Sequence, residues 1–282
     1  MSKQVGKQIK QITTDVTGRL SCKICVQSVL SFFFPIILFI AGCTTEYNLA
    51  TKQEETLIYS SEKEVKIGDA IAPQIEAQYK IVTDVDVNER VNRILDRIVA
   101  VCDRKDIVYF VKVIDDDPLN AVSLPGGYVY VFRGLTDIIE NDDQLAGVIA
   151  HEVGHITARH GVKRMQAAYA AMVLQVAAAT TAGGRAAAGT SLALTSLFME
   201  YSQQAEFEAD RLGVKYMKRA GYDPSQMASL LSKLKAKQDK EPLRPYSYWR
   251  THPYLSQRVS VVNREATGQL EFKDYLNMPG PY

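Results

Sequence analysis

The chain has 282 residues, of which 46% are hydrophobic and 23% are charged. This composition is ordinary for a globular protein and excludes a wholly disordered or collagen-like chain. The formal net charge of +1 gives no reason to expect a nucleic-acid partner. The charge is unevenly distributed, however, because residues 1–42 hold five basic side chains and one acidic side chain, whereas residues 43–282 are slightly acidic.

The N-terminal 42 residues have the organisation of an export signal. Five basic side chains come before residues 24–42, a stretch of 19 residues without a charge. This stretch ends on small residues, as export signals do. Residues 40–42, Ile-Ala-Gly, stand before Cys43 and resemble the lipobox of bacterial lipoproteins. The resemblance implies a signal peptide over residues 1–42 and a lipid on Cys43. An uncleaved signal anchor is the alternative, because 19 uncharged residues are long enough to span a membrane.

The residues after Cys43 bear on the destination of the protein. Thr44 and Thr45 follow the cysteine, without an aspartate. In lipoproteins of this kind that implies sorting to the outer membrane, with the protein facing the periplasm of a bacterial cell envelope. The sequence up to residue 60 is polar and has no clear hydrophobic period, so we predict that residues 43–60 form a lipidated tether. The folded domain is then expected to occupy residues 61–282.

The first half of this domain predicts two helices and a small sheet. The helices are expected from Ser61 to about Val82 and from Asp86 to Val101, the second because apolar residues recur at spacings of three and four. Ile107–Ile114 and Gly127–Phe132 are rich in β-branched and aromatic residues, which favours strands. We expect these two strands to pair.

The second half is expected to be mostly helical. Asp142 or Asp143 is the expected cap of a helix that reaches about His160. Further helices are predicted at Gln166–Ala182, at Thr190–Tyr201, in the following segment up to about Arg219, and at Pro224–Lys237. Residues 183–185 are expected to form a flexible joint. A membrane hairpin within residues 167–184 is the alternative to packing between helices, although Ala, Thr and Gln175 give it a weak driving force.

The segment from His151 to His155, His-Glu-Val-Gly-His, carries the clearest chemical signal. On a helix, His151 and His155 leave the same face and can bind one metal ion. Glu152 then lies beside the ion, where it can accept a proton from a water molecule that the ion activates. A helix whose two histidines make ordinary hydrogen bonds is the alternative.

A zinc site with three protein ligands needs one more residue. His160 is a poor candidate, because on a continuous helix it would lie about 140° round from His155, and we expect it to be structural. Glu206 is a better candidate, and Asp210 shares its helix face, so one of the two can bind metal while the other orients a ligand imidazole. Glu208 would point away from Glu206 and is expected to be a surface charge.

Several motifs occur in a characteristic order. His151–His155 is followed about fifty residues later by Glu206-x-Glu208-Ala209-Asp210, and residues 120–127 read Asn-Ala-Val-Ser-Leu-Pro-Gly-Gly. His252-Pro253 and Arg258 complete the set. Together these motifs, over about residues 66–266, resemble the HtpX and CAAX prenyl protease family of zinc metallopeptidases, and within it the periplasmic BepA and LoiP type.

The resemblance implies a gluzincin with a zincin-like fold. This is an α+β domain, predominantly helical, with the metal-binding motif on a helix and a small β-sheet. One Zn²⁺ per chain would be bound by His151, His155 and Glu206, with Asp210 in contact with a ligand. Glu152 would act first as general base and then as general acid.

The same resemblance implies where the substrate binds. The residues concerned are Asn120, Ala121, Pro125, Gly126 and Gly127. Leu124–Val131 is expected to be an edge strand to which a substrate peptide adds as an extra strand, a mode that recognises backbone more than sequence. An ordinary hairpin strand is the alternative.

His252 and Arg258 have more than one possible role. In proteins of the BepA type, a loop histidine at the place of His252 can approach the zinc and hold the enzyme latent. Its alternatives are a hydrogen bond to the transition state and simple packing before Pro253. Arg258 is expected either to stabilise the developing oxyanion or to pair with an acidic neighbour.

The sequence therefore predicts a lipid-anchored zinc endopeptidase. Its substrates are expected to be unfolded, misfolded or misassembled envelope proteins, and the envelope assembly machinery is a possible partner. Sixteen residues follow Ala266, so we expect the shorter LoiP-type architecture rather than a helical-repeat domain. The alternative is a non-proteolytic assembly factor or holdase that uses the same groove only for binding.

Overall fold

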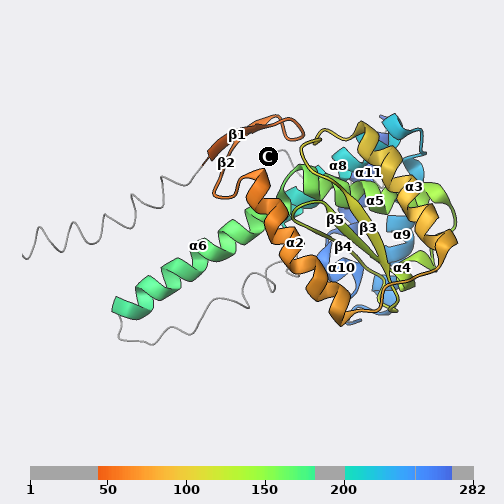
Figure 1. The fold of residues 1–282 in the computed structure, drawn as a ribbon. Helices are drawn as coiled ribbons and strands as arrows, with labels where there is room; N and C mark the ends of the chain where they lie inside the picture. The colour runs from red at the N-terminus through yellow and green to blue at the C-terminus, as the bar shows by residue number, and fades with distance from the viewer. Residues whose placement is uncertain (1–43, 182–200, 245, 269–282) are drawn as a thin grey trace, which may run out of the picture. The chain divides into compact units, whose positions relative to one another are not determined.

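The computed structural model describes residues 44–181, 201–244 and 246–268 (Figure 1). Its contacts divide the chain into two units, Met1–Thr45 and Glu46–Tyr282, and the architecture given below is that of the second. The signal predicted over residues 1–42, Cys43 and nearly all of the helix predicted at Thr190–Tyr201 lie outside the described residues.

A three-stranded sheet lies inside the second unit. Its strands are β3 (Phe110–Ile114), β4 (Ala121–Leu124) and β5 (Tyr128–Phe132), in the order β3-β5-β4. The two predicted strands do pair, in parallel, but β4 was not predicted and runs antiparallel to β5.

The prediction of a single edge strand over Leu124–Val131 is wrong. Leu124 ends β4, and β5 is bonded on both sides. Gly126 and Gly127 separate the strands with φ angles of 82° and 102°, values that favour glycine and reverse the chain. The edge strand next to the turn is therefore β4.

The two faces of the sheet pack against different helices. Ile71 and Ile75 of α2 (Ser61–Gln78) pack against one face, with Val122 and Tyr130. The opposite face, which includes Val113 and Val131, packs in the main core with α3 (Val85–Val101) and α5 (Asp142–Thr157). The domain therefore has a buried sheet with helices on both sides, as expected for an α+β fold.

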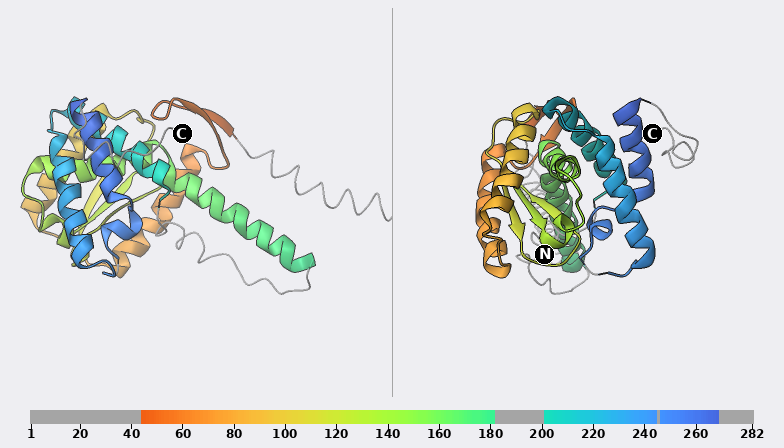
Figure 2. Two further views of the ribbon diagram at one scale, coloured as in Figure 1. Left: turned by 180° about the vertical axis from the view of Figure 1, so that it is seen from behind. Right: turned by 90° about the vertical axis from the view of Figure 1, so that its right-hand side faces the viewer.

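The described residues form six further helices. They are α4 (Arg133–Thr136), α6 (His160–Thr181), α8 (Gln203–Ala220), α9 (Ser225–Lys240), α10 (Tyr248–Thr251) and α11 (Leu255–Thr267). Helix α5 lies between the sheet and the helices α8, α9 and α11 (Figure 2), and every residue from Gln144 to Thr157 is buried. The predicted metal motif is thus on the central helix.

Two boundaries of α5 differ from the prediction. The side chain of Asn141, and not Asp142 or Asp143, caps the helix by accepting a hydrogen bond from the Gln144 backbone N–H. The helix also ends at Thr157, before His160. Arg159 lies in the left-handed region with φ 56°, so the chain turns and His160 begins α6.

The segment predicted as a tether is instead a hairpin over most of its length. Strands β1 (Thr44–Asn48) and β2 (Gln53–Leu57) pair. Asn48 Nδ2 donates to the Thr157 carbonyl at 3.1 Å, and Lys163 Nζ donates to Glu55 at 2.7 Å. The physical reason is that this polar sequence pairs its side chains with groups near the junction of α5 and α6.

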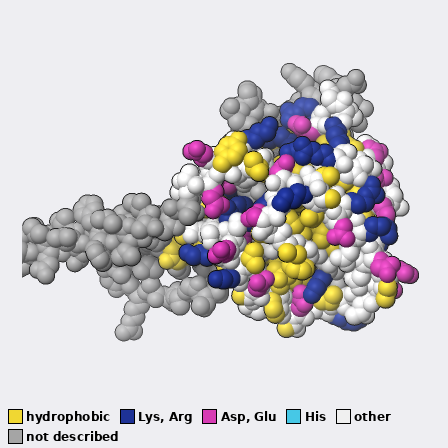
Figure 3. Space-filling view, turned by 45° about the horizontal axis from the view of Figure 1, so that its top comes forward, with side chains coloured by type: hydrophobic (Ala, Val, Ile, Leu, Met, Phe, Trp, Pro, Cys, Tyr) yellow, Lys and Arg dark blue, Asp and Glu magenta, His cyan; other side chains and the backbone are white. Residues whose placement is uncertain are grey.

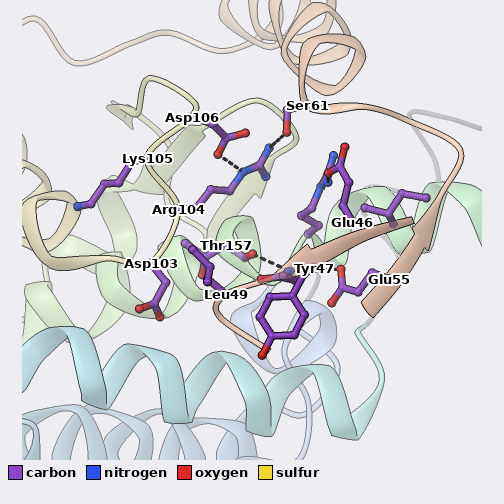
Figure 4. A pocket seen from close by; sticks show the side chains of 13 residues that line it. Glu46, Tyr47, Leu49, Glu55, Ser61, Asp103, Arg104, Lys105, Asp106 and Thr157 are labelled. Carbon is purple, nitrogen blue, oxygen red and sulfur yellow. Dashed lines mark hydrogen bonds and ion pairs between the residues drawn. The ribbon is translucent and has the colours of Figure 1, made fainter. Parts of the chain in front are cut away.

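A buried ionic network lies beside this hairpin. Glu64 is 1% exposed and accepts hydrogen bonds from both terminal nitrogens of Arg104, at 3.0 and 2.8 Å, and from Arg159 Nε at 3.1 Å. Arg104 also donates to the carbonyl of Ile156 in α5. A cavity of about 390 Å³ adjoins the network, and Figure 4 shows Arg104 within it, turned toward Asp106 and Ser61. The network ties α2 to the end of the metal-motif helix.

Basic and acidic side chains are interspersed on the face shown in Figure 3. Within the described residues, no helix is both long enough and apolar enough to cross a membrane.

Candidate metal centre

Helix α5 brings His151, Glu152 and His155 into the core. All three side chains are buried, and none of the histidines shows on the face in Figure 3. The two imidazole rings meet edge to face, and their Nε2 atoms are 3.0 Å apart. The four-residue spacing thus places two nitrogen donors at one point, as the helical period requires.

Glu206 reaches the same point from α8. Its Oε1 lies 3.3 Å from His155 Nε2, and its Oε2 lies 3.6 Å from His151 Nε2. The helices approach closely because Gly154 faces the backbone of Ala209, where an added Cβ would lie 2.8 Å from the carbonyl oxygen. A side chain at position 154 would therefore separate the helix that carries the histidines from the helix that carries Glu206.

His252 is the fourth member of this cluster. It follows α10, and its Nδ1 lies 3.1 Å from Glu206 Oε1 and 3.4 Å from His151 Nε2. One potential ligand atom from each of the four residues lies within 4.8 Å of the others. Zinc–nitrogen bonds of about 2.0–2.1 Å in a tetrahedron place neighbouring ligand atoms roughly 3.3 Å apart, so these residues fit one zinc ion.

Glu152 lies next to the cluster without joining it. Among the residues that the structure describes, no group donates a hydrogen bond to either of its carboxylate oxygens, although both are buried. The nearest cationic group is His252, whose Nε2 lies 3.4 Å from Oε1. A buried carboxylate without donors is costly, and a metal ion with a water molecule would supply the missing partners.

Asp210 and Arg258 support the cluster from behind. Asp210 Oδ1 lies 2.9 Å from His151 Nδ1. Arg258 donates to Asp210 through Nε and Nη2, both at 2.8 Å, and its Nη1 lies 2.7 Å from Glu206 Oε2. Of the two roles expected for Arg258, the structure therefore favours pairing with acidic neighbours over contact with an oxyanion.

The electrostatics suit a metal site. Burial lowers the pKa of His155 well below its usual value, which favours the neutral imidazole that binds metal. Burial alone would raise the pKa of Glu206, but the charges of Arg258 and His252 hold it well below the usual range. Asp210 has a lowered pKa for the same reason, because Arg258 outweighs its burial. Both carboxyl groups are thus kept ionised.

Two contacts of His155 were not expected from the sequence. Its Nδ1 lies 2.8 Å from His160 Nδ1, and His160 Nε2 lies 3.0 Å from Glu208 Oε2. Tyr201 stacks on the His155 ring with centroids 3.9 Å apart, and the Arg164 guanidinium lies over the other side of Tyr201. Glu208, which was predicted to be a surface charge, has a side chain that is 30% exposed, and it also contacts the buried His160.

The predicted substrate residues lie next to α5. Asn120 stands before β4, and its Oδ1 accepts a hydrogen bond from Thr251, directly before His252. Pro125 and His155 line the same small cavity of about 10 Å³. The Gly126 N–H points toward Glu64 at 3.4 Å. Ala121 pairs with Val131, and the backbone of Gly127 approaches Val108. The turn and β4 are thus fixed beside the cluster.

Comparison with known sequences identifies the family. Residues 86–266 match the sequence model of Peptidase family M48. The chain belongs to this family. The predictions of a zinc metallopeptidase with one metal ion and of a zincin-like fold are therefore confirmed at the level of the M48 family.

Several curated proteins are similar to this M48 chain. The Beta-barrel assembly-enhancing protease of Escherichia coli (strain K12) is 28% identical over 238 residues, 81% of this chain and 48% of that protein. The Yersinia pestis protein of that name is 28% identical over 73% of this chain and 44% of its own length. Mitochondrial metalloendopeptidase OMA1 of Schizosaccharomyces pombe is 31% identical over 61% of this chain and 51% of its own. The chain spans about half the length of the curated relatives it matches.

We predict that Gly154→Ala damages both the fold and the M48 metal centre. The new methyl group must displace Ala209 of α8, at a cost of about 1–3 kcal/mol in the free energy of unfolding, and Glu206 moves with that helix. Denaturant unfolding and titration with a zinc chelator measure the two effects. Gly161→Ala is the matched control, because its Cβ would lie 3.5 Å from Pro125 in ordinary contact. Equal stability and zinc affinity in both variants would contradict the proposed packing constraint.

Proposed function

We propose that the protein is a zinc-dependent endopeptidase of the bacterial cell envelope, acting on misfolded or misassembled envelope proteins. The observation that carries this proposal is Glu152, a buried carboxylate to which no described residue donates a hydrogen bond, beside four residues that fit one zinc ion. A protein that only binds its clients has no need of such a base. The names of the relatives, among them a β-barrel assembly-enhancing protease, support the choice of substrate class.

The residues divide the chemistry among them. His151, His155 and Glu206 would hold the zinc, which when bound polarises the peptide carbonyl and makes a nearby water more acidic. Glu152 takes the proton from the attacking water and later delivers it to the leaving amine. Asp210 holds His151 through Nδ1, and Arg258 holds Asp210 and Glu206.

The position of β4 supports recognition of extended chains. It is an edge strand beside α5, and an edge strand offers backbone groups to which a peptide can add. Asn120, Ala121, Pro125, Gly126 and Gly127 would form this substrate surface. Because backbone hydrogen bonds carry little sequence information, this mode suits a protease for unfolded segments.

His252 would keep this site latent. Its ring occupies one corner of the ligand cluster and its Nε2 lies near Glu152, so in this arrangement the ring stands where a substrate carbonyl would have to lie beside the base. Tyr248 stacks on the ring with centroids 4.5 Å apart. Displacement of His252 would therefore precede cleavage.

We further propose that a lipid on Cys43 anchors the protein to the outer membrane, facing the periplasm. The lipobox-like residues 40–42 and the bacterial relatives support this location. The envelope assembly machinery is the proposed partner, in keeping with the relatives' names.

Glu152→Gln is predicted to abolish proteolysis while leaving zinc in place. Removal of the general base costs about 10²–10⁴-fold in rate, and Glu152 is not among the four clustered ligands. Two quantities are measured, the cleavage of an unfolded, disulfide-free protein and the amount of bound zinc. Both are compared with and without Glu152→Gln, once in the natural chain and once in a His252→Ala background. Glu62→Gln, an exposed change in α2, is the control. Equal cleavage with and without Glu152 would exclude the assigned mechanism and favour a holdase.

His252→Ala is predicted to raise basal proteolysis, because it opens the corner that His252 fills. The rate of cleavage of the same unfolded protein is compared with that of Arg250→Ala, an exposed change in the short helix that precedes His252. A lower rate than in the natural chain would instead assign His252 a direct part in catalysis.

Cys43→Ser is predicted to move the protein from the membrane fraction to the soluble fraction of the envelope and to remove the lipid mass from its N-terminal peptide. Cys22→Ser, which lies before the lipobox-like residues, serves as control and should leave both unchanged. Retention of the Cys43→Ser protein in membranes would point to the uncleaved signal anchor.

A further inference from the structure

His155 is the one histidine of the cluster whose second ring nitrogen contacts another histidine. Its Nε2 faces the ligand atoms of His151 and Glu206. Its Nδ1 lies 2.8 Å from Nδ1 of His160, and His160 in turn places Nε2 at 3.0 Å from Glu208 Oε2. The three residues therefore form a line of hydrogen bonds that leads from the cluster to a carboxylate.

The distances determine where the protons lie. Two ring nitrogens at 2.8 Å need one hydrogen between them, so one nitrogen donates and the other accepts. If His155 is to offer a lone pair at Nε2, its proton must be on Nδ1, and His160 Nδ1 must accept. The proton of His160 is then on Nε2, where it donates to Glu208. One carboxylate thus fixes the tautomers of two imidazoles in succession.

The surroundings support this direction of the hydrogen bonds. An ionised carboxylate can only accept, and Glu208 shares the wall of a cavity of about 470 Å³ with Lys163, whose positive charge favours its ionised form. His160 is 5% exposed and its contact with His155 is buried, so water has little access to replace that contact. Tyr201, stacked on His155, prevents the ring from turning away.

We propose that His160 and Glu208 are positioning residues that hold His155 in the tautomer with a free Nε2, and so set the zinc affinity of the site. This inference rests on the proposed function, because it assigns His155 as a zinc ligand. It also assigns a role to two residues that spacing along a single helix would leave out of the site.

The first test measures zinc affinity directly, by competition with a chelator, on the full chain. Glu208→Ala is expected to weaken zinc binding by about 10–100-fold, the usual effect of losing the partner of a ligand histidine. Gln204→Ala, one turn earlier on the same helix and exposed, is the matched control and should bind zinc as the natural chain does. If Glu208→Ala changes the zinc affinity by less than about twofold, a change far below that usual effect, the proposal is overturned.

A second variant separates tautomer control from packing. In His160→Asn, the amide oxygen can accept from His155 Nδ1–H without help from a carboxylate. This variant is expected to retain most of the zinc affinity, and adding Glu208→Ala to it should cause no further loss. An equal loss from Glu208→Ala in both backgrounds would show a merely structural role and overturn the proposal.

The third measurement does not depend on any variant folding. The chain contains four histidines, so nitrogen-15 correlation spectra of their rings can be assigned, and they report the tautomer of each ring. In the natural zinc-free protein we expect His155 protonated on Nδ1 and His160 on Nε2, and the reverse would overturn the proposal. If the natural chain binds no zinc at all, the proposed function fails together with this inference. If it binds zinc and the variants bind equally well, only the inference fails.

Discussion

The metal centre depends on one positive charge, that of Arg258, placed among buried carboxylates. Glu152, Glu206 and Asp210 are all fully buried, and an uncompensated buried charge costs several kcal/mol. Arg258, itself fully buried, binds two of these carboxylates through three nitrogen atoms. Its charge is therefore used within the protein, which explains why it lies behind the ligands. Among the residues that the structure describes, Glu152 has no comparable partner, so a cation that enters the cluster would balance its charge.

The parts of this centre that the sequence predicted lie within single helices. His151, Glu152 and His155 share α5, and Glu206 and Asp210 share α8, so the helical period alone fixes which side chains project together. The pairing of the two predicted strands followed in the same way from local composition. The family resemblance then joined the two helices, because no local period indicates that residues fifty positions apart meet.

The contacts that the sequence did not predict depend on where elements end and on distant pairs. Strand β4 has four residues, all buried, and therefore lacks the alternation that reveals a half-buried strand. The contact of His160 with His155 requires α5 to stop at Thr157 and the chain to turn at Arg159. A continuous helix, as assumed from the apolar pattern, would have carried His160 away. The hairpin before α2 is likewise fixed by side-chain contacts with residues about one hundred positions away.

The four residues of the cluster differ in what supports them from behind. Asp210 contacts His151, the His160–Glu208 pair contacts His155, and Arg258 contacts Glu206. The other ring nitrogen of His252 faces Glu152, the proposed base, at 3.4 Å, and stacking on Tyr248 holds the ring on one side. Since buried hydrogen bonds to charged groups contribute roughly 1.5–3 kcal/mol each, Asp210 and Arg258 make His151 and Glu206 costly to move. His252 instead contacts the carboxylates of the site itself, Glu206 and Glu152, so its departure would free both a position in the cluster and the proposed base. Displacement of this single side chain is therefore the step that the proposed latent arrangement would require before a peptide could bind.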